Sequence, residues 1–167
     1  YEEAAAGSDP LNAGSYPHSA WAHKLQIIFS GYGRSETLTN FPALVELSPN
    51  ISEFSYADFL SGERSDLRFA GADEVTALNY EVDKWDTNGA SRVWVQVQLL
   101  SGADTTIYAY WGNSSATDQP PAYTINGTTW ANGYEGVWHM RQTNDLDSTP
   151  YARHGMAVGT VTPVPNA

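Results

Sequence analysis

The stretch Arg92–Leu99, RVWVQVQL, decides the fold of this chain. Apolar and polar residues alternate along most of it, and the side chains of a β-strand point alternately to opposite faces of its sheet. The stretch is therefore predicted to be a strand with one face in a core and the other toward solvent. The outward face is expected to carry Arg92, Gln96 and Gln98. The inward face is expected to carry Val93, Val95, Val97 and Leu99.

The same two-residue period continues on both sides of this stretch. Together with Arg92–Leu99, six strand candidates lie between Lys24 and Trp111. Turn-forming residues separate them, and Asn88-Gly89 suits a tight hairpin because both residues tolerate positive φ. Many short strands at this spacing predict an all-β fold, an antiparallel β-sandwich of the jelly-roll or immunoglobulin-like kind. The other five candidates are Lys24–Ser30, Ala43–Leu47, Asp66–Phe69, Leu78–Asp83 and Thr106–Trp111.

Outside these candidates the period is interrupted. Ile51–Leu60 has apolar residues at helical spacing, which predicts one or two helical turns, or a loop packed by its aromatic residues. Gly136–Met140 and Gly155–Val161 are predicted to be two further strands, which cannot bury a core by themselves. The expected divisions are an extended N-terminal leader over 1–20, a β-sandwich domain over 21–113, a linker over 114–133 and a C-terminal strand segment over 134–167.

The composition excludes several classes of function. The chain has 167 residues, and its formal net charge of -11 repels phosphate backbones and anionic lipid. It has no cysteine, so it has no disulfide, no thiolate nucleophile and no cysteine-based zinc site. This absence favours a prokaryotic surface protein or a cytosolic one. No apolar run approaches transmembrane length, so we expect neither nucleic-acid binding nor membrane insertion.

No motif predicts catalysis. The GxSxG elbow, the phosphate-binding loop and the dinucleotide fingerprint are all absent. Glu81 and Asp83 are candidates for a glycosidase carboxylate pair, but any acidic chain offers such pairs. We expect no catalytic residue, no metal site and no cofactor. The histidines lack metal-binding spacing and are expected to be structural or solvent-exposed: His18, His23, His139 and His154.

Two acidic motifs have a structural interpretation. Asp66 and Arg68 share a strand face, and we expect an ion pair between them, or with Glu81, rather than a charged binding site. A second acidic stretch offers possible calcium ligands, but the pattern of a calcium-binding loop is absent. A turn held by Asx side chains is the better interpretation of these residues, Asn144, Asp145 and Asp147.

Aromatic residues and sequons offer candidate glycan sites. Aromatic faces stack on sugars, although cross-strand packing is the stronger interpretation of the same residues. N-x-S/T sequons at strand ends or in the linker are candidates for glycosylation. The candidate glycan-contact aromatics are Trp85, Trp94, Tyr108 and Tyr110. The glycosylation candidates are Asn50, Asn113 and Asn126.

Six sequence blocks follow one another along the chain. They are Trp21 with Lys24, Leu38-Thr39-Asn40-Phe41-Pro42, Ser65-Asp66-Leu67-Arg68-Phe69, Tyr80-Glu81 with Trp85, Val93-Trp94-Val95 and Tyr108-Ala109-Tyr110-Trp111-Gly112-Asn113. In this order the blocks resemble a domain of unknown function found in large prokaryotic surface and exported proteins. The resemblance covers about Trp21 to Asn113.

In that family a concanavalin-A-like, laminin-G-like sandwich often follows the domain. Gly136–Met140, Asp147-Ser148-Thr149 and His154-Gly155 are similar to the opening of such a sandwich, although the chain stops before one could close. The family has no established catalytic residues. The resemblance implies display outside the cell, adhesion or glycan contact.

These observations lead to one expected function and its alternatives. We expect a non-catalytic, secreted or cell-surface structural module, a subunit of a fibre that self-associates through strand addition by its terminal segments and carries glycans. The alternative is a carbohydrate-binding or adhesin module of a larger exported protein. A glycoside-active enzyme is a third, weaker alternative.

Overall fold

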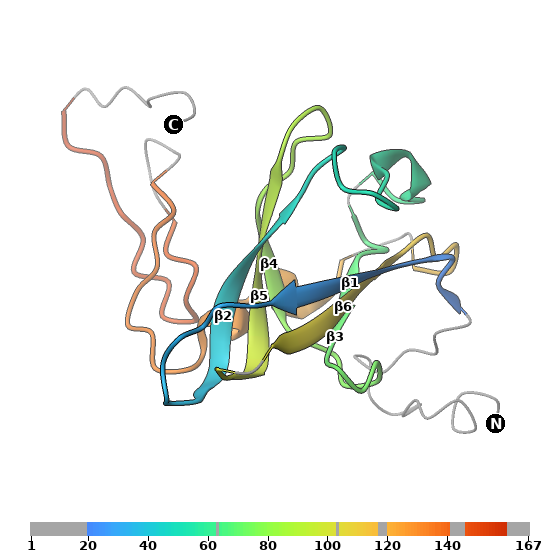
Figure 1. Cartoon of the computed structure of the whole chain (residues 1–167). Coiled ribbons are helices and arrows are strands. Elements are labelled where there is room, and N and C mark those ends of the chain that lie inside the picture. The colour runs from blue at the N-terminus through green and yellow to red at the C-terminus, as the bar shows by residue number, and fades with distance from the viewer. Residues whose placement is uncertain (1–19, 63, 103, 117–119, 141–145, 160–167) are drawn as a thin grey trace, which may run out of the picture.

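The computed structural model describes residues 20–62, 64–102, 104–116, 120–140 and 146–159. They form a sandwich of two antiparallel sheets with short 3₁₀ turns (Figure 1). The strands are β1 His23–Phe29, β2 Leu38–Leu47, β3 Arg68–Ala70, β4 Tyr80–Lys84, β5 Ser91–Leu100 and β6 Thr105–Trp111. The 3₁₀ turns are η2 Tyr56–Asp58, η3 Ala122–Thr124 and η4 Thr128–Trp130. In the part of the chain described, no helix is long and apolar enough to cross a membrane.

Each sheet has three strands, in the orders β1-β6-β3 and β2-β5-β4. All four strand pairings are antiparallel, and each of the six strand candidates between Lys24 and Trp111 contributes to at least one of them. The all-β sandwich is therefore confirmed.

The core lies between the sheets and is built by the alternation of the central strands. Val93, Val95 and Val97 of β5 face Ile107 and Trp111 of β6, and all are at most 2% exposed. A fully buried valine or isoleucine contributes about 1.5–3 kcal/mol through the hydrophobic effect. Alternation on these two strands therefore supplies much of the energy that holds the sheets together.

The alternation breaks near the end of β5. Leu99, predicted to point inward, is 60% exposed, while Leu100 is 7% exposed. The pairing matches Thr39 with Leu99 and Phe41 with Val97, and Asn40 between them has a φ of 50°. This left-handed residue interrupts the pleat opposite Gln98, so the inward face passes from odd to even positions.

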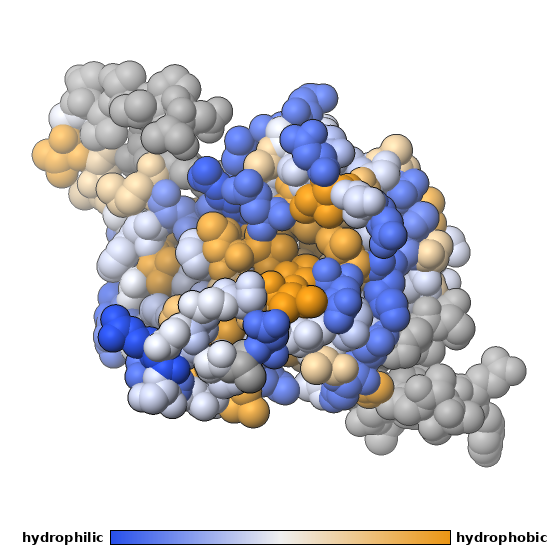
Figure 2. Space-filling view, viewed as in Figure 1, coloured by the Kyte–Doolittle hydropathy of each residue, from blue (hydrophilic) through white to orange (hydrophobic). Residues whose placement is uncertain are grey.

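The sandwich is closed at one side and more open at the other. At the β3–β4 side the Leu78 amide donates to the Phe69 carbonyl at 2.9 Å, and Phe69 and Tyr80 are at most 1% exposed. At the other side lie the edge strands β1 and β2. Figure 2 shows hydrophobic residues gathered in a hollow of this face. Ala43, Val45 and Leu47 of β2 are at most 7% exposed, but the core-facing side chains of β1 and of the first half of β2 are only partly buried. These partly buried side chains are Leu25, Ile27, Phe29, Leu38 and Phe41.

Ile51–Leu60 forms one short turn packed by aromatic rings. Ser55 caps η2, its Oγ accepting from the Ala57 amide at 3.1 Å. Phe54 meets Tyr56 and Trp111 edge-on, with ring centroids 4.9 Å and 5.2 Å apart. The segment thus closes one end of the core. It has both features that the sequence offered as alternatives, because it contains one helical turn and is packed by its aromatic residues.

The connection from β4 to β5 is not the tight hairpin predicted at Asn88-Gly89. Neither residue has a positive φ. Asp86 organises the turn instead, because its Oδ1 accepts from the Asn88 amide at 3.1 Å and its carbonyl accepts from the Gly89 amide at 3.3 Å. An Asx turn at Asp86 therefore makes the chain reversal between β4 and β5 that two residues with positive φ were expected to make.

Of the stretch expected to be a linker, residues 120–133 pack against the sandwich at β4: η3 covers the edge of the core beside Tyr80, and η4 lies over the outer face of the β2–β5–β4 sheet (Figure 1). Thr129 and Trp130 are 0% and 4% exposed, and the Tyr123 ring lies edge-on to Tyr80 at 5.5 Å. This part of the chain behaves as a layer of the domain rather than as a spacer, because two aromatic side chains bury enough apolar area to hold it. The domain boundaries themselves stay a prediction.

The C-terminal segment has no strand in its described part. Gly136–Met140, predicted as a strand, makes one isolated bridge, between Trp138 and Asp147. Residues 155–159 of the second predicted strand form no strand and are mostly exposed. Most of the hydrogen bonds that Val137, His139 and Ser148 make involve a side chain, although the Ser148 amide donates to the Val137 carbonyl. The leader, residues 1–19, lies outside the described residues.

Candidate functional site

The polar outer face of the β2–β5–β4 sheet carries the densest side-chain network. Because residues two apart on a strand share a face, Glu81 and Asp83 of β4 both point away from the core. Trp94 on the neighbouring strand β5 lies on the same face, since Glu81 is its partner in the sheet. Trp130, His139 and Ser148 lie over this face and supply the partners of these side chains.

Glu81 is the centre of the network. Its Oε1 accepts from the Ser148 hydroxyl at 2.7 Å and lies 3.0 Å from His139 Nε2. Its Oε2 accepts from the indole of Trp130 at 2.5 Å. Burial raises the pKa of the Glu81 carboxyl, but the hydrogen bonds from His139, Ser148 and Trp130 outweigh burial and leave this pKa below its usual value. The carboxylate is therefore the stable form at neutral pH.

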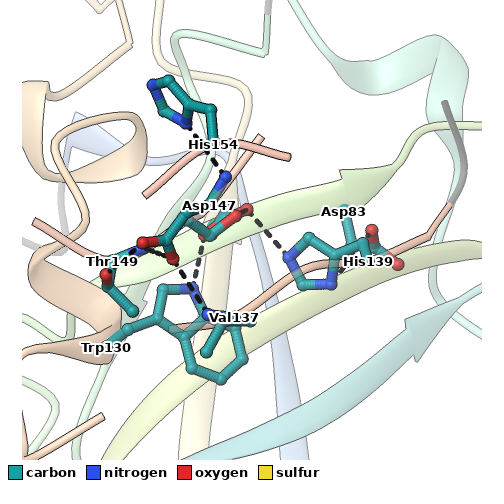
Figure 3. Close-up of polar contacts among 9 residues, drawn as sticks. Asp83, Trp130, Val137, His139, Asp147, Thr149 and His154 are labelled. Carbon is teal, nitrogen blue, oxygen red and sulfur yellow. Dashed lines mark hydrogen bonds and ion pairs between the residues drawn. The ribbon is translucent and has the colours of Figure 1, made fainter. Parts of the chain in front are cut away.

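His139 lies between two carboxylates (Figure 3). Its Nε2 is 3.0 Å from Glu81, and its Nδ1 is 3.5 Å from Asp83 Oδ1. The ring stacks over Trp94 at a centroid distance of 6.3 Å and is tilted against Trp130 at 5.8 Å. The His139 side chain is 16% exposed, so solvent screens these contacts weakly.

Asp147 ties together the segment that carries Ser148. Its carboxylate accepts from the amides of Val137 at 2.9 Å, Thr149 at 3.0 Å and Arg153 at 2.9 Å. Although burial opposes the charge, these bonds lower the pKa of Asp147 to about 2. This is the Asx turn expected for the acidic stretch, whose other members Asn144 and Asp145 lie outside the described residues.

The geometry of the network matches neither of two catalytic arrangements that its residue types suggest. The Ser148 hydroxyl donates to Glu81 rather than to His139, whereas a serine nucleophile needs a base that takes its proton. A glycosidase needs its two carboxylates free to flank a sugar, and here His139 lies between them. Among the described residues, no group of three His, Asp or Glu side chains is placed to hold a metal ion. The arrangement attaches Trp130, His139 and Ser148 to the sheet.

Asp66 and Arg68 are structural, but they do not form the expected ion pair. Asp66 is 0% exposed, and its Oδ2 accepts from the amides of Leu60 at 2.7 Å and Gly112 at 3.2 Å. Arg68 donates to the Ser65 carbonyl and lies over the Trp21 ring at 5.4 Å. Asp66 therefore joins two loops rather than binding a neighbouring cation.

The structure does not bring the four candidate glycan aromatics together. Trp94 lies on the outer face of the β2–β5–β4 sheet, under Trp130. Trp85 follows β4 and packs edge-on against Tyr56 and Phe59. Tyr108 and Tyr110 belong to the other sheet, where Tyr110 is 1% exposed and donates to Glu74. Packing thus accounts for three of these four rings, and Tyr108 carries Lys24 over its face.

The three sequons differ in accessibility. Asn50 and Asn126 are exposed, whereas Asn113 is 8% exposed. The Asn113 Oδ1 accepts from the Ser115 amide at 2.8 Å, so its amide group is held inside a turn. The Asn126 Oδ1 accepts from the Thr128 amide at 3.0 Å. Only Asn50 and Asn126 have the surface position that was expected of all three.

The pairing of Glu81 with His139 escaped sequence reasoning, which had considered the two residues separately. They are 58 positions apart, and no periodicity links them. The one available signal was the spacing of Glu81 and Asp83 on the polar face of a strand. Two carboxylates so placed indicate that a cationic side chain lies near them, but they do not identify that residue.

Comparison with known proteins agrees with part of the sequence analysis. Residues 63–132 match the model of a domain of unknown function, DUF2341. The match runs from the loop before β3 to just beyond η4, so it includes the layer over the outer sheet face. Neither a curated protein nor a solved structure matches the chain.

Proposed function

We propose that this chain is a non-catalytic, extracellular structural module that self-associates into a cell-surface fibre by strand addition. The asymmetry of the sandwich is the observation that carries the proposal. The β3–β4 side is closed by hydrogen bonds between the sheets, whereas Leu25 and Ile27 of β1 and Phe41 of β2 are only partly buried at the other side. An edge of this kind offers both backbone hydrogen bonds and apolar contacts to an added strand.

The C-terminal segment supplies a donor of suitable chemistry. Residues 155–158 belong to no helix or strand, and Met156 and Val158, two positions apart, are 83% and 87% exposed. Side chains at this spacing fall on the same face of a strand, so both could enter the hollow of a neighbouring copy. Addition of this head-to-tail kind does not close on itself and produces an open filament.

Two further observations support the remaining parts of the proposal. The best-placed carboxylates, Glu81 and Asp83, are engaged by residues of the chain itself, which favours a structural role over catalysis. The resemblance to surface and exported proteins, together with the exposed sequons at Asn50 and Asn126, supports an extracellular and glycosylated module. The carbohydrate-binding alternative has less support, because its four candidate aromatics are divided between two sheets.

A matched pair of substitutions on β1 tests the proposal. Ile27 points into the core side of the opening, whereas its neighbour Ile28 is 52% exposed on the other face. An inward charge blocks strand addition, so Ile27→Lys is expected to abolish filaments seen by electron microscopy, while Ile28→Lys preserves them. Circular dichroism verifies that both variants fold. A wild-type protein that stays monomeric by light scattering and shows no filaments would contradict the proposal.

A further inference from the structure

Two aromatic side chains lie exposed at the surface, outside the network around Glu81. Trp138 and Tyr151 are 42% and 57% exposed. Figure 1 shows the segment that carries them on the side of the β2–β5–β4 sheet that faces away from β1 and β6. Single exposed apolar side chains are ordinary, whereas large ones that gather in one place mark a contact surface. The question is therefore whether these two rings belong together.

Arg153 joins the two rings into one cluster. Its carbonyl accepts from the Trp138 indole at 3.0 Å, and its guanidinium lies 4.7 Å from the centre of the Tyr151 ring. The guanidinium also donates to the carbonyl of Glu135 at 2.7 Å and to its carboxylate at 2.8 Å. The side chains of Arg153 and Glu135 are 53% and 75% exposed. The cluster thus presents two aromatic rings, a guanidinium and a carboxylate to solvent.

Each ring is supported on one side by the protein. A Cβ at Gly136 would lie 2.3 Å from Cη2 and 2.7 Å from Cζ3 of Trp138, so the indole rests directly on the glycine backbone. The Tyr151 ring is supported by the guanidinium of Arg153 through a cation–π contact. Much of the area of both rings is still open to solvent, so each can pack against a bound molecule.

The buried Asp147 fixes the backbone beneath the cluster. It is 5% exposed, and its carboxylate accepts from the amides of Val137 and Arg153, both at 2.9 Å. It also forms the isolated bridge with Trp138. Because one carboxylate holds the backbone next to both rings, the side chains need little further ordering when they bind. A surface prepared in this way loses less conformational entropy on binding.

Aromatic faces beside a guanidinium and a carboxylate fit the chemistry of a sugar ring. A pyranose with equatorial substituents has C–H groups on its faces, which pack on aromatic rings, and hydroxyls around its edge. Arg153 can donate hydrogen bonds to such hydroxyls, and Glu135 can accept them. Phosphate ligands fit less well, because Glu135 lies beside Arg153 and the chain has a formal net charge of -11.

We propose that Glu135, Trp138, Tyr151 and Arg153 form a binding site for a neutral saccharide built from equatorially substituted pyranoses, such as a cellulose-derived or chitin-derived oligosaccharide. The two rings stack on the sugar faces, while Arg153 and Glu135 bind the hydroxyls. The site is shallow, so we expect a dissociation constant on the order of 1 mM. It lies outside the four aromatic candidates of the sequence and is independent of the assembly proposal.

Titration of the full chain with cellohexaose and with chitohexaose, followed by nuclear magnetic resonance, tests the site. The indole N–H signal of Trp138 reports stacking, since this group donates to the Arg153 carbonyl at the centre of the cluster. We expect this signal to shift and to reach saturation. The indole signals of Trp94 and Trp130, which pack against each other at a ring distance of 5.4 Å on the sheet, are expected to stay unchanged.

Two substitutions remove one ring each. Trp138→Ala and Tyr151→Ala are each expected to weaken saccharide binding about tenfold, the effect of losing one stacked ring. Tyr151→Ala keeps the bond from its own amide to the Thr149 hydroxyl at 3.3 Å, so it is expected to leave the loop in place even if Trp138→Ala does not.

A control variant and a folding check accompany them. Ile125 is 86% exposed in the connection between η3 and η4, and Ile125→Ala is expected to bind the sugar as the wild type does. The Ser148 amide donates to the Val137 carbonyl at 2.8 Å, so its protection from hydrogen exchange verifies that the segment remains folded in each variant.

Three results would overturn the proposal. The first is the absence of a saturable Trp138 shift with either sugar at about 10 mM, tenfold above the expected dissociation constant. The second is unchanged sugar binding in a folded Tyr151→Ala variant. The third is a saturable shift with a proline-rich peptide, whose rings also stack on aromatic side chains, when neither sugar produces one.

Discussion

Buried carboxylates do much of the local organisation in this acidic protein. Asp66, Glu81 and Asp147 are each held by hydrogen-bond donors, and for Asp66 and Asp147 these are mainly backbone amides. A buried carboxylate is tolerated only when such donors replace the water it has lost. Each of the three joins segments that are distant in the sequence or closes a turn, which explains why they are internal while most acidic side chains remain outside.

Removal of the Asp66 carboxylate is expected to destabilise the whole sandwich. In Asp66→Ala the amides of Leu60 and Gly112 lose their acceptor inside the protein. We expect a loss of about 2–5 kcal/mol in the free energy of unfolding, the cost of two unsatisfied buried donors. Chemical denaturation followed by tryptophan fluorescence measures it.

Asp58 is the matched control for that change. Its side chain is 37% exposed and lies 3.7 Å from His23, so water can replace the contact. Asp58→Ala is expected to change stability by no more than about 0.5 kcal/mol. Equal effects of the two substitutions would show that Asp66 does not join the two loops energetically.

At the scale of elements, η4 is the point where the C-terminal segment meets the sandwich. Gly127, just before it, has a φ of 80°, and a Cβ there would lie 2.5 Å from the Pro150 nitrogen and 2.6 Å from the Thr149 carbonyl carbon. The close approach of residues 149–150 therefore requires glycine in addition to the left-handed backbone.

Gly127→Ala is expected to separate the C-terminal segment from η4. Gly133 offers a close control, because its φ is 79° and a Cβ there would have no neighbour within 4 Å. Both substitutions carry the left-handed penalty of about 1–2 kcal/mol, but only Gly127→Ala adds the steric clash. We expect Gly127→Ala to lower hydrogen-exchange protection at Ser148 well below that of Gly133→Ala. Equal protection in the two variants would contradict this packing.

The elements differ in how far their sequences predict them. Strands with a regular apolar period, such as Arg92–Leu99, were predicted correctly. Burial of one face of a strand requires an apolar residue at every second position, and this period is visible in the sequence. Residues 120–133 were mistaken for a linker because 3₁₀ turns bury isolated side chains, Tyr123 and Trp130, without any period. Glu81 and His139 could not be paired, since only the folded chain brings them together. Local pattern thus predicts the sheets, while the site depends on long-range packing.

At the scale of the whole molecule, residues 120–133 and the C-terminal segment after them are attached to the sandwich by different kinds of contact. The layer at residues 120–133 is buried by aromatic contacts, with Trp130 4% exposed. The segment after it is held by polar contacts and turns most of its apolar side chains outward. Tyr151, Met156 and Val158 are 57%, 83% and 87% exposed. Elements with few buried apolar contacts open at lower cost than the core, so the segment is expected to open while the sandwich stays folded.

Limited digestion with chymotrypsin tests this order of opening. We expect the first cleavage within the described residues to follow Tyr151, because its ring is exposed and its loop is held by polar contacts. Cleavage after Tyr123 and Trp130 requires residues 120–133 to leave the sheet. It is expected to be at least about tenfold slower, because an added opening free energy of about 1.4 kcal/mol lowers the population of the open state tenfold. Mass spectrometry of the new C-termini measures both rates. If Trp130 were cleaved as fast as Tyr151, residues 120–133 would not be a stable layer of the domain.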